Sequence, residues 1–241
     1  MKKKLFNLVM IGIASAVYSQ KVSAGIDEFA ETANQKIRLR DSMPLYLQKH
    51  SAWKDVHYGQ EDILEEATIG KCGCGICSMA MVASFLEQRE ITPKAIADFF
   101  LQKPLEDYYV SGIGTKWNSF KILASHYGFK ISKLGIYSKT EFKENGKPKF
   151  KRPGFDQLKK HLAIGEAVIV FFSGQGGTFT NSGHLMVLKQ DNSGKIRMFD
   201  PDDSEEKYHY QREIDIDRDL VDTSKSKIIR LWSFSKERRL C

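Results

Sequence analysis

The sequence has little cysteine and proline, with 4 and 6 of these among 241 residues, and its 18 glycines are an ordinary share. This proline and glycine content excludes a collagen-like chain, and 41% hydrophobic residues exclude a disordered one. No apolar run suits a multi-span membrane protein, and internal repeats and low-complexity linkers are absent. The sequence is therefore that of an ordinary globular protein, long enough for one sizeable core.

The first 24 residues are typical of a targeting segment. A triplet of lysines precedes an apolar stretch, and Val22-Ser23-Ala24 supplies the small residues that a signal peptidase reads. We therefore predict a signal peptide over residues 1–24, cleaved after Ala24. A membrane-anchored N-terminus is the alternative, although the apolar stretch is short for a bilayer. The expected location is secreted, periplasmic or at the cell surface.

The formal net charge of +7, from 37 Lys+Arg and 30 Asp+Glu, could indicate a nucleic-acid partner. Residues 1–24 contain four of the lysines and no acid, so much of the excess leaves with the signal peptide. We therefore predict no nucleic-acid partner, and no stable membrane insertion after cleavage. The oligomeric state stays open.

Hydrophobic periodicity changes along the chain from a helical to a β pattern. Apolar stripes predict four helices, beginning near Ile76, Thr92, Trp117 and Phe155. Runs of β-forming residues predict strands over 43–48, 167–172, 184–189, 196–199 and 227–234. The fold class is therefore α+β, with N-terminal helices packed against a C-terminal antiparallel sheet. Residues 25–42 are expected to be a leader or an N-terminal helix, and residues 43–241 a single domain.

Three of the four cysteines, Cys72, Cys74 and Cys77, crowd at the start of the first predicted helix, and Cys241 is the last residue. A thiol in the first turn of a helix faces unpaired N–H groups and the positive end of the dipole, which favour the nucleophilic thiolate. Gly73 and Gly75 flank Cys74, and we expect them to let a substrate chain approach the sulfur.

Three interpretations of this cluster compete. Cys74-Gly75-Ile76-Cys77 is formally a Cys-x-x-Cys redox pair, although the apolar strand that should lead into such a motif is absent. Three thiolates could hold zinc, but structural zinc prefers four ligands, and Cys241 would have to return to the cluster. The third interpretation is a nucleophilic cysteine served by a distant imidazole and a third group that orients it.

Metal and cofactor chemistry is not expected. The stretch from Asp200 to Asp222 contains ten acids, but it lacks the Asp-x-Asp-x-Asp-Gly spacing of a calcium loop and is better explained as a solvated acidic face. We predict no metal and no cofactor.

The second half of the chain supplies partners for a nucleophile. His184 begins a predicted strand after Gly183, and Asp200 follows the next predicted strand. Adjacent antiparallel strands could bring the imidazole and the carboxylate side by side. A histidine at a strand start is, by itself, more often structural. His184 is therefore a candidate base only in combination with Cys74 and Asp200.

These segments resemble papain-like cysteine peptidases, in the secreted, stand-alone branch related to the bacteriocin leader (double-glycine) processing domains. Gly73-Cys74-Gly75-Ile76-Cys77-Ser78-Met79-Ala80-Met81-Val82 is similar to the family's nucleophile segment. Gly183-His184-Leu185-Met186-Val187-Leu188 and Asp200-Pro201 are similar to its histidine strand and Asp-Pro pair. Leu45-Tyr46-Leu47-Gln48 resembles the segment that presents an oxyanion-hole glutamine. Ile76 replaces the family's usual proline, and Cys77 a small residue.

The resemblance implies a papain-like fold and an exported peptidase that acts on a peptide or protein substrate. It implies that Cys74 is the nucleophile, His184 the base and Asp200 the residue that orients it, with Gln48 in the oxyanion hole. Gly73, Gly75 and Gly183 are expected to contact substrate. Acyl transfer by the same triad, thiol–disulfide exchange by Cys74 and Cys77, and a catalytically silent binding protein remain alternatives. The disulfide pairing among Cys72, Cys77 and Cys241 stays open.

Overall fold

A computed structural model describes residues 43–59, 67–110, 114–136, 143–144, 147–148, 153–173, 183–203, 213–221 and 227–236. These residues belong to one compact unit, Ser42–Cys241. The expected signal peptide, the leader over residues 25–42 and Cys241 lie outside the described residues. Within those residues, no helix combines the length and apolar character needed to cross a membrane.

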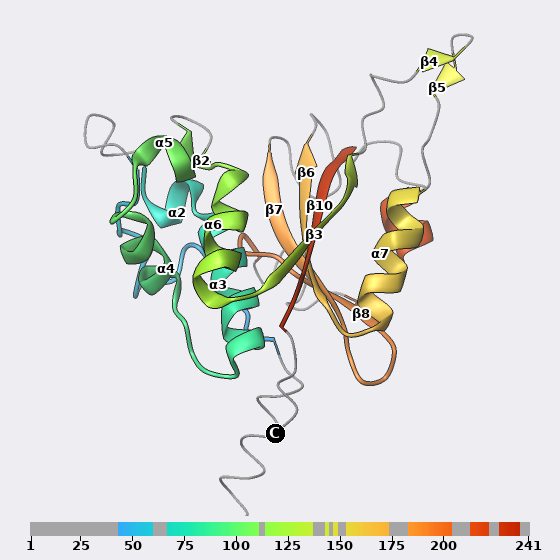
Figure 1. The fold of residues 1–241 in the computed structure, drawn as a ribbon, viewed down its shortest axis with the longest axis horizontal. Coiled ribbons are helices and arrows are strands. Elements are labelled where there is room, and N and C mark those ends of the chain that lie inside the picture. Colours follow the sequence, from blue (N-terminus) through green and yellow to red (C-terminus); the bar gives the residue numbers. More distant parts are fainter. Residues whose placement is uncertain are drawn as a thin grey trace, which may run out of the picture. The chain divides into compact units, whose positions relative to one another are not determined.

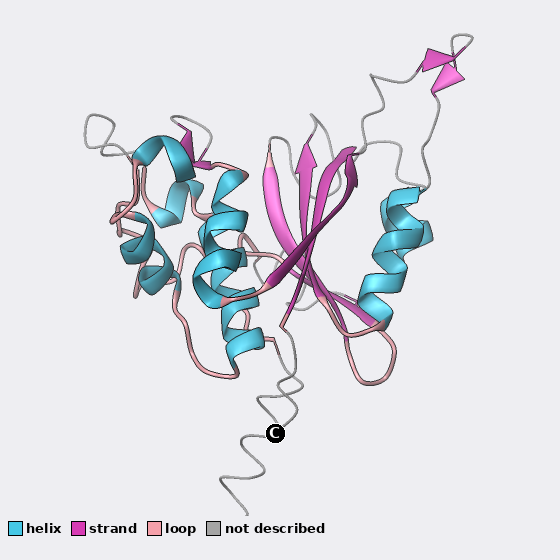
Figure 2. Ribbon diagram, viewed as in Figure 1, coloured by secondary structure: helices cyan, strands magenta, loops and turns pink. Residues whose placement is uncertain are grey.

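In the described part of the chain, the helices between Ile69 and Tyr127 come first and form one side of the unit, whereas the helix Pro153–Ala163 lies on the other side of the sheet (Figures 1 and 2). Their bounds are α2 Ile69–Cys72, α3 Cys74–Glu87, α4 Pro93–Phe100, α5 Leu105–Tyr108 and α6 Asn118–Tyr127. Two short antiparallel strands, β1 Tyr109–Val110 and β2 Gly114–Thr115, pair between α5 and α6.

Local signals in the sequence begin and end two of these helices. Thr92 caps α4, because its side chain accepts a hydrogen bond from the Ala95 N–H, and Pro93 is the first residue of that helix. Gly128 ends α6 in a left-handed conformation (φ +69°) that a residue with a side chain rarely adopts.

The second half of the unit is an antiparallel sheet. Among the described residues it has six strands in the order β3-β10-β6-β7-β8-β9, and every neighbouring pair is antiparallel. The strand bounds are β3 Lys130–Ile136, β6 Ala167–Ser173, β7 His184–Gln190, β8 Ile196–Phe199, β9 Glu213–Ile214 and β10 Lys227–Ser235. A separate hairpin pairs β4 Lys143–Glu144 with β5 Lys147–Pro148.

Strand β6 is buried on both faces because helices cover both sides of the sheet. Ala167 and Ile169 belong to a hydrophobic cluster with α3, α4 and α6, whereas Val168 and Val170 belong to a second cluster with α7 (Pro153–Ala163). Alternate side chains of a strand point to opposite faces, so a continuous apolar run is what such a strand requires. The expected α+β fold, with helices against an antiparallel sheet, is confirmed.

One predicted element is wrong. Residues 43–48 form no strand; the chain instead turns after Gln48, where the His50 N–H bonds to the Leu47 carbonyl. The Gln48 N–H donates to the Pro201 carbonyl at 2.7 Å. The segment is therefore held by a hydrogen bond to a distant part of the chain and not by the regular pairing of a β-strand. Strands β3 and β9 and the π-helical turn η2 (Ile216–Val221) were not predicted.

Candidate active site

Cys74 is the first residue of α3. Gly73 is the N-cap, and the short helix α2 immediately precedes it, so the chain enters α3 from a helix rather than from a strand. The first N–H groups of a helix have no partners within it, and they face a side chain at this position. Residues Gly75 to Ser84 are all buried, whereas Cys74 itself is partly exposed. The helix thus holds one accessible thiol at its positive end.

A hydrogen bond between α3 and β7 brings the histidine strand to this helix end. The Ser78 hydroxyl, one turn along from Cys74, donates to the carbonyl of Leu185 at 3.3 Å. His184, the residue before Leu185, is the first residue of β7 and is buried. The Cys74 side chain lies close enough to the imidazole to raise the pKa of His184.

Asp200 holds the other side of the imidazole. The sheet register pairs Val187 with Phe199, so the residues after β8 lie beside the first residues of β7. His184 Nε2 lies 2.6 Å from Asp200 Oδ1. That oxygen also accepts the Asp202 backbone N–H at 2.8 Å, which fixes the carboxylate. Because Asp200 occupies Nε2, Nδ1 is the ring nitrogen left to face Cys74.

The electrostatics favour a charged imidazole. Burial opposes the charge, but the hydrogen bond that the imidazole donates to Asp200, the nearby Cys74 side chain and the charges of both raise the pKa of His184 to about 10. Asp200 is 1% exposed, so water screens this pair little.

Gln48 bonds both to the segment that carries Asp200 and to the short helix that precedes Cys74. Its backbone N–H bonds to the carbonyl of Pro201, next to Asp200, and its side-chain Nε2 donates to the Gly70 carbonyl in α2 at 3.3 Å. The Gln48 side chain is buried, and its Oε1 has no hydrogen-bond partner within the described residues. The structure therefore brings Cys74, His184 and Asp200 together, with Gln48 anchored beside them.

Gly73 and Gly75, on either side of Cys74, allow neighbouring protein atoms to pack closely against the backbone. A Cβ on Gly73 would lie 2.4 Å from the Ile69 carbonyl oxygen, and one on Gly75 would lie 2.4 Å from the Thr115 hydroxyl. Protein atoms fill the space that we expected an approaching substrate to use, and both glycines are buried. Gly183 differs, because it is exposed and lies against the Phe171 ring. Substrate contact by these glycines stays a prediction.

The neighbouring thiols have different environments. Cys77 is fully buried, and burial, together with the charge of Cys74, raises its pKa well above the usual value. Cys72 is partly exposed, and Cys72, Cys74 and Cys77 are all free thiols. Within the described residues, no three His, Cys, Asp or Glu side chains converge as metal ligands would.

Sequence reasoning missed a role for Tyr58. Its ring is fully buried, and its hydroxyl donates to the carbonyl of Cys72, two residues before the nucleophile candidate. Burial and the charges of Cys72 and Cys74 raise the pKa of this hydroxyl well above its usual value, so it stays a donor. No signal in the sequence predicts this contact, because a buried tyrosine is ordinary core unless its hydroxyl partner is known.

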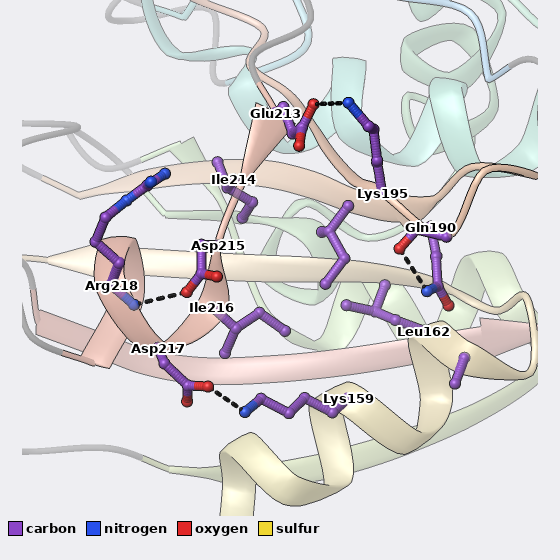
Figure 3. Close-up of a pocket in the computed structure, with 13 residues that line it drawn as sticks. Lys159, Leu162, Gln190, Lys195, Glu213, Ile214, Asp215, Ile216, Asp217 and Arg218 are labelled. Carbon is purple, nitrogen blue, oxygen red and sulfur yellow. Dashed lines mark hydrogen bonds and ion pairs between the residues drawn. The ribbon is translucent and has the colours of Figure 1, made fainter.

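A hollow of about 540 Å³ lies elsewhere, among α7, β8, β9 and η2 (Figure 3). Ion pairs line it, with Lys159 2.6 Å from Asp217 and Lys195 2.9 Å from Glu213. Neither Cys74 nor any other candidate catalytic residue contributes to its wall. Its charged groups already pair with one another, so it contributes nothing to the chemistry of the thiol.

A comparison with protein families finds a match over most of the chain. The model of the Peptidase_C39 like family matches residues 42–221, which include all four candidate catalytic residues. The chain belongs to the Peptidase_C39 like family. This confirms the expected relationship to papain-like cysteine peptidases.

Among solved structures, the chain resembles a crystal structure from Bacillus anthracis that is assigned to the C39-like peptidases. The identity is 14% and the TM-score 0.40, and the match covers 69% of this chain and 90% of the other. No curated protein matches the chain.

Proposed function

We propose that this member of the Peptidase_C39 like family is an exported cysteine peptidase that hydrolyses peptide bonds with Cys74, His184 and Asp200. The observation that carries the proposal is the 2.6 Å hydrogen bond between His184 and Asp200, together with the nearby Cys74 thiol, which raises the pKa of the same imidazole. A partly exposed thiol, a buried imidazole and a buried carboxylate in this order are what nucleophilic catalysis by cysteine requires.

In the proposed first step, the Cys74 thiolate attacks the peptide carbonyl carbon and forms the S–C bond. The charged imidazole beside it stabilises the thiolate before attack. His184 then transfers its proton to the amide nitrogen as the C–N bond breaks, and the amine leaves. Asp200 keeps the ring oriented and stabilises its positive charge throughout.

In the second step, His184 takes a proton from water, and the resulting hydroxide attacks the thioester. The C–S bond breaks, the carboxylic acid leaves, and the Cys74 thiolate remains beside the protonated His184, which restores the charged pair. Acyl transfer would differ only in replacing water with an amine.

The proposed oxyanion hole combines the Cys74 backbone N–H with the side-chain amide of Gln48. An amide nitrogen has two N–H donors, and one of these already bonds to Gly70. The proposal assigns the second donor to the oxygen that becomes negative in the tetrahedral intermediate. The anchoring of Gln48 at Pro201 and Gly70 supports this, because a preorganised donor loses little entropy on binding.

Turnover of a peptide library by the reduced protein tests the function. Wild type should cleave peptides, while Cys74→Ala and His184→Ala should lose turnover and keep the wild-type circular-dichroism spectrum. Cys77→Ser serves as the matched thiol control and should retain activity. If Cys77→Ser abolishes turnover as completely as Cys74→Ala does, the nucleophile is assigned to the wrong cysteine.

Export stays part of the proposal, because the signal-peptide residues lie outside the described part of the chain. Sequencing the N-terminus of the mature protein tests it: a start at Gly25 supports export, and a start at Met1 in a cytosolic fraction contradicts it.

A further inference from the structure

Two thiols with opposite exposure occupy the first turn of α3. Cys74 is the first residue of the helix and is partly exposed, whereas Cys77, three residues later, is fully buried. The Cys77 N–H donates to the Gly73 carbonyl at 2.9 Å, so the turn that carries both cysteines is a regular helical turn. Residues three apart on a helix are neighbours on one face, and both thiols therefore belong to the same face of α3. A dissolved oxidant can reach Cys74, but it cannot reach Cys77 directly.

Cys72, the third thiol near this helix end, is a poorer partner for Cys74. Its sulfur donates a hydrogen bond to the Thr68 carbonyl at 3.4 Å, one turn back along α2. Gly73 joins Cys72 to Cys74 in a near-helical conformation (φ −87°, ψ 13°), and residues two apart in such a conformation do not face each other. Cys77 is therefore the neighbouring thiol that shares a face with Cys74.

The helix holds Cys74 and Cys77 close to the separation that a disulfide needs. Cα atoms three residues apart in an α-helix are about 5 Å apart, within the range of about 4.4–6.8 Å found in disulfides. The Cβ atoms, about 5–6 Å apart on a helix, must approach each other by about 1–2 Å. Cys74 begins the helix, where its own N–H makes no hydrogen bond within the helix. A bond between the two sulfurs therefore requires only a local rearrangement of the first turn.

On the basis of the proposed function, we infer that Cys74 and Cys77 form a redox pair that switches the peptidase off. A hydroperoxide oxidises Cys74, Cys77 captures the oxidised sulfur as a disulfide, and a dithiol returns the enzyme to its active state. Cys77 is then a modification site and takes no part in peptide hydrolysis. The pair protects the nucleophile, because a disulfide is reversed by thiols, whereas a cysteine oxidised to sulfinic acid is not.

In the first step, the Cys74 thiolate attacks the outer oxygen of the hydroperoxide. The S–O bond forms, the O–O bond breaks, and the imidazolium of His184 gives its proton to the departing oxygen. An alcohol leaves, or water when the oxidant is hydrogen peroxide. Cys74 is then a sulfenic acid, because the hydroperoxide has taken two electrons from its sulfur.

In the second step, the Cys77 sulfur attacks the sulfenic sulfur of Cys74. The S–S bond forms, the S–O bond breaks, and the hydroxyl group leaves as water with the thiol proton of Cys77. Burial and the charge of Cys74 both raise the pKa of the Cys77 thiol, and oxidation of Cys74 removes the second of these causes. A dithiol reverses the reaction by two thiol–disulfide exchanges, which leave both cysteines as thiols and the reductant as a disulfide.

Differential alkylation of wild type tests the pair without any peptide substrate. Reduced protein is treated with equimolar hydrogen peroxide, denatured in iodoacetamide to label the remaining thiols, and then reduced and labelled with N-ethylmaleimide. The three clustered cysteines lie in one tryptic peptide, residues 72–89, whose fragment ions locate each label. We expect N-ethylmaleimide on Cys74 and Cys77 and iodoacetamide on Cys72. Any other pattern, including N-ethylmaleimide on Cys74 alone or on Cys241, overturns the inference.

Recovery of peptide turnover tests the switch. Wild type that has been inactivated by excess hydrogen peroxide should regain turnover in dithiothreitol. Cys77→Ser should lose turnover permanently, because its Cys74 passes on to sulfinic acid. Cys72→Ser, which removes the other neighbouring thiol, is the matched control and should recover as wild type does. Permanent loss in wild type, or recovery of Cys77→Ser, contradicts the switch. If Cys77→Ser fails to fold, the wild-type label pattern decides by itself.

The two experiments separate this inference from the proposed function. A disulfide between Cys74 and Cys77, in a protein that cleaves no peptide when reduced, supports the redox pair and contradicts the peptidase. Peptide turnover that hydrogen peroxide abolishes without forming this disulfide supports the peptidase and contradicts the switch.

Discussion

His184 and Asp200 are joined by a 2.6 Å hydrogen bond between Nε2 and Oδ1, with both side chains almost completely buried. This bond assigns Nε2 to the carboxylate and leaves Nδ1 for the thiol. The orientation of the ring is therefore fixed before any substrate arrives, and four predictions depend on it or on its surroundings.

The first prediction concerns Asp200→Asn. The amide keeps the shape of the carboxylate but loses its charge, so the imidazolium is less stabilised and the ring tautomer is no longer enforced. We expect kcat/KM to fall on the order of 10²–10⁴-fold, by analogy with carboxylate removal in triad enzymes. Asp191→Asn, at the exposed turn between β7 and β8, is the control and should leave peptide turnover at the wild-type rate.

The second prediction concerns Gln48→Ala. Loss of one oxyanion donor typically lowers kcat by about 10²–10³-fold, and substrate binding should change much less. Gln190→Ala is the control, because its amide also donates to a glycine carbonyl, that of Gly194, in an exposed turn. A Gln48→Ala enzyme with unchanged kcat would show that the amide serves only to hold Gly70.

The third prediction concerns the thiols of Cys74 and Cys77. Iodoacetamide at neutral pH, followed by peptide mapping, should alkylate Cys74 in the folded protein and leave Cys77 unmodified, because Cys77 is buried and its pKa is raised. Mapping after denaturation provides the control, since all thiols then react. Rapid modification of Cys77 in the folded state would contradict the packing of α3.

The fourth prediction concerns pH and stability. The pKa of His184 is raised from 6.5 to about 10, so the folded state holds this proton more tightly than the unfolded chain. The resulting stabilisation is complete below about pH 6.5 and is lost as the pH rises toward 10. Urea unfolding across this range should show the free energy of unfolding decreasing.

Asp200→Asn provides the comparison for that measurement. The amide cannot support the charged ring as the carboxylate does, so the variant should lose less stability than wild type over the same pH range. NMR titration of the His184 ring gives an independent value. A ring that titrates near 6.5 in the folded wild-type protein would contradict the prediction.

The sequence predicts the start of the helix that carries Cys74 well because its signal is local. A cysteine followed by an apolar helical stripe marks a helix start, and α3 indeed begins at Cys74. The central strands were predicted for a similar reason, since burial on both faces requires continuous apolar runs such as Ala167 to Phe172.

The elements that the sequence does not predict are those that tertiary contacts determine. β3 and β9 are the edge strands of the sheet and need only one buried partner, so their residues show no continuous apolar run. The segment around Gln48 has a strand-like composition, but its backbone bonds to Pro201, which is distant in sequence. The contact between Tyr58 and Cys72 likewise needs the folded chain.

The hydrogen bond from Ser78 to Leu185 links the start of the nucleophile helix to the start of the histidine strand. Each of these residues lies within four positions of a candidate catalytic side chain. The thiol and the imidazole therefore belong to one cooperative structure, and neither can be displaced without straining the other. Heat or denaturant should consequently abolish peptide cleavage in the same transition that melts the helix, with no inactive but folded intermediate between them.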